Sequence, residues 1–171
     1  MPLFTLQFDS SRIFEFARRY KYQDDDIALE AGERIKTGLF TRMNVEQIFG
    51  WKTKGRGRSR LLKNTDDEIA DALRLVVDAR TDRAAIAVLL GLSGVGVPVA
   101  SAIVTAIYPD RFTIIDFRAL EALGISRSLA TSITVEFYLK YLKYCRELAK
   151  TNRVSLRELD RALWQWSKEN S

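Results

Sequence analysis

The sequence predicts an all-α protein. Only 9 of its 171 residues are glycine and 3 are proline, too few for a sheet with many tight turns. Hydrophobic residues make up 47% of the chain, which is ample for a packed core, and in several segments they recur at three- and four-residue spacing. We expect a compact bundle of helices in a single domain, residues 1–171, or alternatively two lobes, one of them completed by both chain ends.

Three helices are expected in the first fifty residues, where apolar positions recur on one face. They are a helix capped by Ser10 or Ser11 and reaching Tyr20, a helix from Asp24 to Thr37 stopped by Gly38, and a short helix, Val45–Phe49, between Asn44 and Gly50.

The stretch from Trp51 to Lys63 has a different character. It reads WKTKGRGRSRLLK, with basic residues at almost every second position, no acid and two glycines. Because this composition does not suit a core helix, we predict a mobile basic loop. One interpretation is a charged loop in solvent. The favoured one is an arm that follows DNA phosphates, since a run of like charge repels itself unless a polyanion is near. Its contacts would be Lys52, Lys54, Arg56, Arg58 and Arg60.

The rest of the chain predicts further helices, several with defined ends. They are a helix opened by the capping box Thr65/Glu68, a helix over Asp82–Leu90, a buried helix over Val99–Tyr108, a short helix from Asp116 to Gly124, a long helix over Ser128–Lys150, and a helix from the capping box Ser155/Glu158 to Trp166. The stretch PDRFTII, which begins at Pro109, is expected to be extended because β-branched residues follow the proline.

Histidine is absent and Cys145 is the only cysteine. Ser/His and Cys/His nucleophile pairs, zinc sites rich in these residues and internal disulfides are therefore excluded. Any catalysis would depend on carboxylates or lysines. We expect no cofactor and no metal site built from side chains.

Charge and hydropathy indicate the kind of partner and the location. The formal charge of +5 and the pI near 9.4 favour a polyanionic partner. The opening residues, MPLFTLQFDSSR, do not resemble a secretory signal, and no apolar run approaches the roughly 18 residues of a membrane span. A cytoplasmic protein without a membrane partner is expected, and its oligomeric state stays open.

The strongest functional signal is Gly94-Val95-Gly96, which joins two expected helices into a helix-hairpin-helix over about residues 84–108. Glycine at both positions permits positive φ and a close backbone approach, and Val95 is expected to anchor the turn in the core. The hairpin amides and the start of the next helix would face outward as unpaired donors, a combination that binds anions. The alternative is an ordinary corner between two helices.

The features around the hairpin follow a recognisable order. They are an apolar helix ending Leu89-Leu90, the hairpin LSGVG, a helix of small residues, an extended segment ending Ile114-Ile115-Asp116, and a helix ending Leu123-Gly124. This order resembles the helix-hairpin-helix DNA glycosylase superfamily over about residues 89–124. The segments DFRAL, Trp51-Lys52 and LDRALWQWSK are similar to a group of short bacterial proteins distantly related to these glycosylases.

The resemblance implies a helical fold of the DNA glycosylase type and a DNA-repair activity, hydrolysis of the N-glycosidic bond of a damaged or modified base, with double-stranded DNA as partner. Asp116 would take the place of the catalytic aspartate, which stabilises the sugar cation and orients the attacking water. Pro98 stands where strand-cutting members carry a lysine, so lyase activity through that position is excluded. A DNA phosphate, with a monovalent cation on the hairpin carbonyls, would be held by the backbone of Gly94, Val95, Gly96 and Val97.

Several of these residues have a second interpretation. Asp116 starts a helix and would cap it by accepting a backbone N–H, worth about 1 kcal/mol, which is compatible with catalysis. Arg118 would pair either with that carboxylate or with a phosphate. Trp51 would stack on an extruded base or pack in the core. The alternative to a glycosylase is a non-catalytic helix-hairpin-helix module that binds DNA, and a third possibility is an interaction scaffold with no nucleic-acid role.

Overall fold

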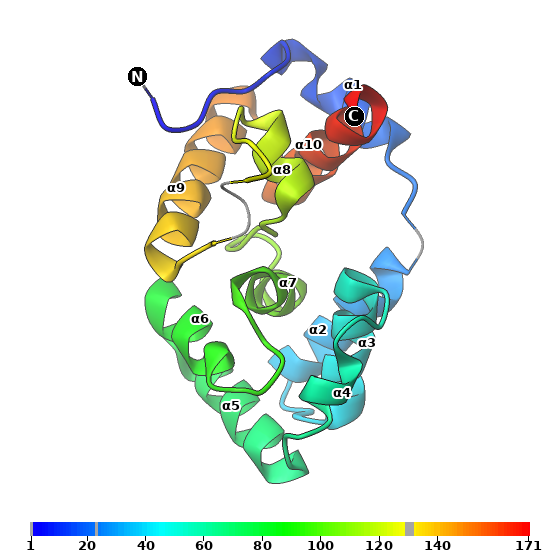
Figure 1. The fold of residues 1–171 in the computed structure, drawn as a ribbon, viewed down its shortest axis with the longest axis vertical. Helices are drawn as coiled ribbons and strands as arrows, with labels where there is room; N and C mark the ends of the chain where they lie inside the picture. Colours follow the sequence, from blue (N-terminus) through cyan, green and yellow to red (C-terminus); the bar gives the residue numbers. More distant parts are fainter. Residues whose placement is uncertain (1, 23, 129–131) are drawn as a thin grey trace. The chain divides into compact units, whose positions relative to one another are not determined.

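The computed structural model describes residues 2–22, 24–128 and 132–171, and every regular element within these ranges is a helix (Figure 1). The expected all-α class is therefore confirmed. The chain forms two units, each with its own internal contacts. Unit 1 is made of both ends of the chain, Met1–Tyr22 and Asp110–Ser171, and unit 2 is Gln23–Pro109.

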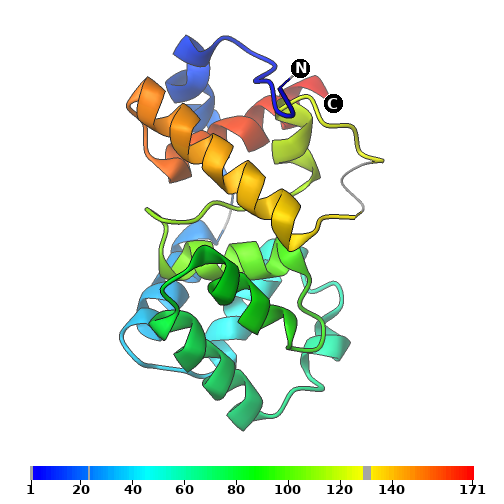
Figure 2. The same ribbon diagram turned by 90° about the vertical axis from the view of Figure 1, so that its left-hand side faces the viewer.

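Unit 1 is arranged around its C-terminal helix, α10 (Leu156–Asn170). This helix contacts three others, α1 (Ile13–Arg19), α8 (Phe117–Ala122) and α9 (Val135–Asn152). A short 3-10 helix, η1 (Ser10–Arg12), leads into α1. The first and last helices of the chain, blue and red in Figures 1 and 2, therefore pack against each other within one unit.

A buried, extended segment, Phe112–Ile115, crosses unit 1 and leads to α8. Buried carbonyls need hydrogen-bond partners, and here two tyrosines of α9 supply them. The Tyr138 hydroxyl donates to the carbonyl of Thr113 at 2.9 Å, and the Tyr141 hydroxyl donates to the carbonyl of Ile114 at 2.7 Å. Burial raises the pKa of Tyr141 well above its usual value, which keeps this hydroxyl a donor. The expected extended stretch is shorter than predicted, because residues 109–111 form a turn; only residues 112–115, which α9 holds, continue without turn or helix.

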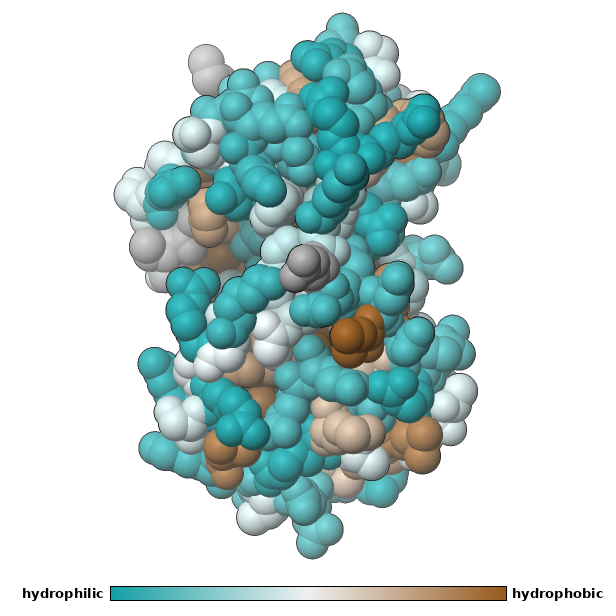
Figure 3. All heavy atoms as spheres, turned by 90° about the vertical axis from the view of Figure 1, so that its right-hand side faces the viewer, coloured by the Kyte–Doolittle hydropathy of each residue, from teal (hydrophilic) through white to brown (hydrophobic). Residues whose placement is uncertain are grey.

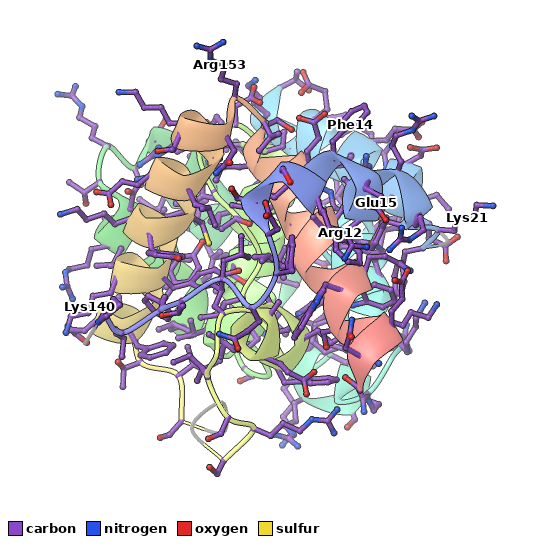
Figure 4. All side chains as sticks on the ribbon, turned by 90° about the horizontal axis from the view of Figure 1, so that it is seen from above. Arg12, Phe14, Glu15, Lys21, Lys140 and Arg153 are labelled. Atoms are coloured by element: carbon purple, nitrogen blue, oxygen red, sulfur yellow. The ribbon has the colours of Figure 1, made fainter. Side chains whose placement is uncertain are left out.

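A charged network joins α1 to α10 on the surface of unit 1. Glu15 accepts hydrogen bonds from Arg12, at 2.9 Å, and from Arg19, and Arg19 also reaches Glu169 on α10 at 2.8 Å. Figure 4 shows Arg12, the last residue of η1, beside Glu15 of α1, where α1 crosses α10. The hydrogen bonds from Arg12 and Arg19 lower the pKa of Glu15 to about 2. Both guanidinium groups of this network therefore have carboxylate partners.

Unit 2 is built around α7 (Val97–Ile107), whose residues from Ala100 to Ile107 are all buried. The expected buried helix is thus confirmed. α7 contacts three helices, α2 (Asp25–Lys36), α3 (Arg42–Thr53) and α6 (Asp82–Leu90). The unit is completed by α4 (Arg58–Leu61) and α5 (Asp66–Asp78), the second of which packs against α6.

The close approach of α2 to α7 depends on Gly32. A β-carbon built at Gly32 would lie 1.9 Å from the carbonyl oxygen of Ala106 on α7, far inside any non-bonded contact. The obstacle is helix backbone, which cannot rotate away as a side chain would. Gly32 therefore sets the distance between the two helices.

The third helix differs from its expected bounds. It begins after Thr41, whose hydroxyl accepts the N–H of Asn44, and it continues through Gly50 to Thr53 instead of spanning Val45–Phe49. Asn44 does not cap the helix, because its side chain donates inward to the carbonyl of Leu39 at 2.9 Å. Packing of the surrounding side chains outweighs the low helix propensity of a single glycine.

In unit 1 the differences also concern helix ends. Asp9, not Ser10 or Ser11, caps the first turn, α9 begins after its cap Thr134, and α10 continues past Trp166. The expected start of α9 at Ser128 adjoins residues 129–131, which lie outside the described residues. Both expected capping boxes, Thr65/Glu68 and Ser155/Glu158, are confirmed. Local caps compete at helix ends, so sequence patterns place these ends least well.

The surface offers no extended apolar region on the face drawn in Figure 3, where hydrophilic residues dominate and apolar side chains form small separate groups. Single exposed apolar side chains of this kind are normal. Of the helices in the described ranges, none combines the length and apolar character that a bilayer crossing needs.

Gly32→Ala is expected to destabilise the protein by at least about 1–3 kcal/mol, because the added methyl group forces α2 away from α7. Gly50→Ala is the matched control, since Gly50 is also inside a helix but a β-carbon there meets no atom within 4 Å. That control should stabilise the protein by up to about 1 kcal/mol. Urea unfolding followed by circular dichroism measures both, and equal effects would contradict the role given to Gly32.

Candidate nucleic-acid interface

The hairpin of unit 2 connects α6 to α7 through residues 91–96. Gly94 has φ of 81°, a left-handed conformation that favours glycine. Gly96 has φ of −94° and ψ of 179°, so the expectation of positive φ at both glycines is wrong for this one, which is simply extended. Val95 is buried and anchors the turn in the core, as expected.

Four backbone N–H groups, in this turn and in the first turn of α7, donate to no acceptor that the structure describes. Within the described residues, no hydrogen bond uses the N–H of Gly94, Gly96, Val97 or Val99. Pro98, in the first turn of α7, has no N–H, and the first amide bonded back to the turn is that of Ala100, which donates to the Gly96 carbonyl at 2.9 Å. Since Gly96 is exposed and Gly94 half-buried, the hairpin retains open donors at a helix N-terminus, where anions bind favourably.

A buried asparagine fixes the hairpin to the preceding part of the chain. Asn64 is 5% exposed, and its Oδ1 accepts the N–H of Ser93 at 2.8 Å while its Nδ2 donates to the carbonyl of Ser93 at 2.9 Å. The same Nδ2 donates to the carbonyl of Leu61, the last residue of α4, at 2.8 Å. One side chain therefore ties the hairpin to α4.

The short helix α4 lies directly against the hairpin. A β-carbon at Gly94 would lie 2.8 Å from the backbone nitrogen of Leu61 and 3.1 Å from the β-carbon of Arg60. Leu61 itself is fully buried. The prediction of a mobile loop over residues 51–63 is therefore wrong: Trp51 and Lys52 belong to α3, and α4 is held by Leu61 and by the hairpin.

The basic residues of this segment differ in their surroundings. Arg58 pairs with Glu46 at 3.3 Å, and the Nε of Arg56 donates to the carbonyl of Thr53 at 3.2 Å. Lys52 and Lys54 also have interactions of their own. Arg60 and Lys63 are exposed and form no ion pair with any residue that the structure describes. Both lie beside the hairpin in space, since the β-carbon of Arg60 approaches Gly94 and Lys63 lines a hollow together with Ser93.

Acidic side chains of α5 lie close to the hairpin. A hollow of about 390 Å³ lies there, lined by Ser93 of the hairpin, by Lys63 and by Glu68 and Asp71 of α5, among others. The two carboxylates repel phosphate, so a polyanion would contact the hairpin and Arg60 outside this hollow, and the charge of Lys63 partly offsets that of the two carboxylates.

Trp51 is in the core of unit 2. It is 6% exposed, and its indole N–H donates to a carboxylate oxygen of Asp25 at 3.0 Å. The packing alternative therefore holds, and the expected stacking of Trp51 on a base is corrected, because its ring is covered by protein.

Asp116 and Arg118 belong to unit 1. Asp116 is half-buried and caps α8, with its Oδ1 accepting the N–H of Ala119 at 2.9 Å. The expected cap is confirmed. Arg118 contacts the hydroxyl of Ser167 at 3.4 Å, and its guanidinium lies 5.1 Å from the ring centre of Phe117.

The hairpin carbonyls that a monovalent cation would use are partly occupied. The carbonyl of Leu92 accepts the N–H of Val95, and that of Ser93 accepts Asn64. Within the described residues, the carbonyls of Gly94 and Val95 accept no hydrogen bond, which leaves two for the expected cation.

The sequence did not point to Asn64, and Lys63 was not among the predicted DNA contacts. An asparagine directly before a capping box is an ordinary turn residue, and no spacing rule connects it to Ser93, which is 29 residues away. The only available signal was that Asn64 ends the basic stretch at the helix boundary.

Asn64→Ala should release the hairpin from α4, because the N–H and the carbonyl of Ser93 both lose their partner. We expect faster hydrogen exchange at the Ser93 amide and a loss of about 1–3 kcal/mol in stability. Asn152→Ala in α9 is the control, since Asn152 only bonds a carbonyl of its own helix. If Ser93 exchanges equally in parent and Asn64→Ala, the clamp does not hold the hairpin.

Comparison of the chain with family models, with curated proteins and with solved structures finds no match.

Proposed function

We propose that the protein binds duplex DNA through the hairpin of unit 2. The observation that carries this proposal is the set of four uncommitted amides, from Gly94 to Val99, beside the free cations Arg60 and Lys63. Backbone N–H groups at a helix N-terminus bind phosphate, and lysine and arginine that replace its counterions supply most of the sequence-independent affinity. A hairpin that contacts only the sugar-phosphate backbone of DNA suits a protein that must move along DNA.

We further propose, on the resemblance to helix-hairpin-helix DNA glycosylases, that the protein hydrolyses the N-glycosidic bond of a damaged or modified base without lyase activity. Asp116 is the group that would act. A fixed carboxylate stabilises the positive charge that develops on the sugar as the base leaves. The cap bond from the Ala119 N–H holds this carboxylate in a fixed orientation.

The alternative is a DNA-binding module without catalysis. The cap bond of Asp116 favours it, because a structural role alone accounts for an aspartate at this position.

Val97→Pro should weaken duplex binding roughly tenfold, because it removes one donor to the phosphate. Proline suits the first helical position, and the extended Gly96 before it is compatible with a following proline, so the fold should be kept. Val97→Ala is the control, since it shortens the same side chain but retains the N–H. Fluorescence anisotropy with a labelled duplex measures both.

A second pair of variants, measured in the same assay, tests how much the positive charges beside the hairpin contribute to duplex binding. Arg60→Gln with Lys63→Gln should lower the affinity and the slope of log Kd against log salt. Lys140→Gln with Lys143→Gln on α9 changes the net charge equally, but in unit 1. If Val97→Pro binds like Val97→Ala, or if the two charge pairs act alike, the hairpin is not the DNA site.

Asp116→Asn should abolish base excision while keeping the stability, because asparagine caps a helix as well as aspartate does but carries no charge. The measurement is the appearance of alkali-labile abasic sites in a panel of duplexes that each carry one damaged base. Asp116→Ala, which loses cap and charge together, shows the structural effect separately. A parent protein that binds the panel but releases no base leaves the non-catalytic module. An Asp116→Asn variant as active as the parent shows that Asp116 is not the catalytic carboxylate.

A further inference from the structure

We propose that unit 1 carries a stacking site for an unpaired nucleotide, formed by Phe117, Arg118 and Arg127 with Trp164 and Lys168 beside them. The proposal rests on the proposed function, because both surfaces would contact the same DNA, but it concerns a different unit and a different ligand. It also assigns the aromatic contact that Trp51, being buried, cannot make.

Phe117 is the centre of this site. It is the first residue of α8, directly after Asp116, and 41% of it is exposed. Two guanidinium groups flank its ring, with the Cζ of Arg127 at 4.7 Å and that of Arg118 at 5.1 Å from the ring centre. Because both groups lie over the ring, a base would stack on Phe117 by displacing one of them, and the displaced arginine would then pair with a phosphate of the nucleotide.

Trp164 on α10 extends the site through Arg118. The Cζ of Arg118 lies 5.2 Å from the indole centre, and the Nζ of Lys168 lies at the same distance. Tyr20 and Tyr22 contact the indole edge-on, with ring centres at 5.3 and 5.5 Å, and hold it in place. Arg118 therefore bridges two aromatic rings on neighbouring helices.

The three cations of this site have no carboxylate partner within the described residues: Arg118, Arg127 and Lys168 form no ion pair there. The nearby Glu121 is engaged by the hydroxyls of Ser167 and Ser171, whose hydrogen bonds, more than the arginines, lower its pKa. On the α1 side of the same unit, Arg19 is instead bound by Glu15 and Glu169. Glu121 attracts Arg118 and Arg127 electrostatically, but within the described residues none of the three cations around Phe117 and Trp164 is held in an ion pair.

The chemistry favours an unpaired nucleotide over other polyanions. A paired base hides its face in the stack, so Phe117 could not reach it without opening the duplex. An acidic peptide would satisfy the cations but would not use the two rings. A single-stranded nucleotide uses both, because each base has an aromatic face and each phosphate pairs with arginine or lysine.

The test measures binding of a fluorescent single-stranded oligothymidylate. Phe117→Leu should bind roughly tenfold more weakly, because it keeps the apolar bulk but loses the ring, and Phe117→Trp should restore binding. Phe14→Leu is the matched control: Phe14, labelled in Figure 4, is another exposed phenylalanine of unit 1 with one arginine, Arg18, 5.5 Å from its ring. Circular dichroism confirms that all variants are folded.

The charges are tested with Arg127→Gln plus Lys168→Gln, which should weaken oligothymidylate binding more than Lys140→Gln plus Lys143→Gln. Binding that is equal in Phe117→Leu and Phe14→Leu, or a polyglutamate peptide bound as tightly as oligothymidylate, overturns the proposal. The result is distinct from a failure of the hairpin, because only duplex binding should respond to Val97→Pro. A Phe117 effect that persists when the hairpin variants have none would support this site alone.

Discussion

The burial of α7 is the constraint on which unit 2 depends. From Ala100 to Ile107 the helix has no exposed residue, and it is surrounded by α2, α3 and α6. Its hydrogen-bonding capacity is used internally along this length, so the uncommitted donors are confined to its first turn. Gly32 permits this burial by letting α2 reach the carbonyl of Ala106. The burial of α7 in the core therefore leaves backbone N–H groups without acceptors at one defined place, the first turn of this helix.

The hairpin and the basic segment form one structure. Asn64 bonds both backbone groups of Ser93, and Gly94 leaves room for the backbone of α4. A preorganised arrangement loses less conformational entropy on binding than a mobile arm would. The backbone of Arg60 is consequently held beside the turn, so that its exposed side chain starts close to the N-terminus of α7.

Charge is distributed unevenly: some cations have a carboxylate partner and others have none within the described residues. Arg19 and Arg58 are bound to carboxylates and stabilise contacts between helices. Arg60 and Lys63 in unit 2, and Arg127 in unit 1, have no such partner within the described residues. The net charge of +5 alone could not distinguish the two groups, because it counts all of them equally.

The sequence by itself determined the all-α class, the buried α7, both capping boxes and the hairpin at Gly94, because these follow from spacing over a few residues. It also identified the cap at Asp116. Only the tertiary structure decided that Trp51 is buried against Asp25, that α4 replaces a loop, and that Asn64 holds Ser93. The grouping of Phe117 with Trp164 was decided in the same way. These features are contacts between residues distant in the chain, and periodicity carries no information about which distant side chains meet.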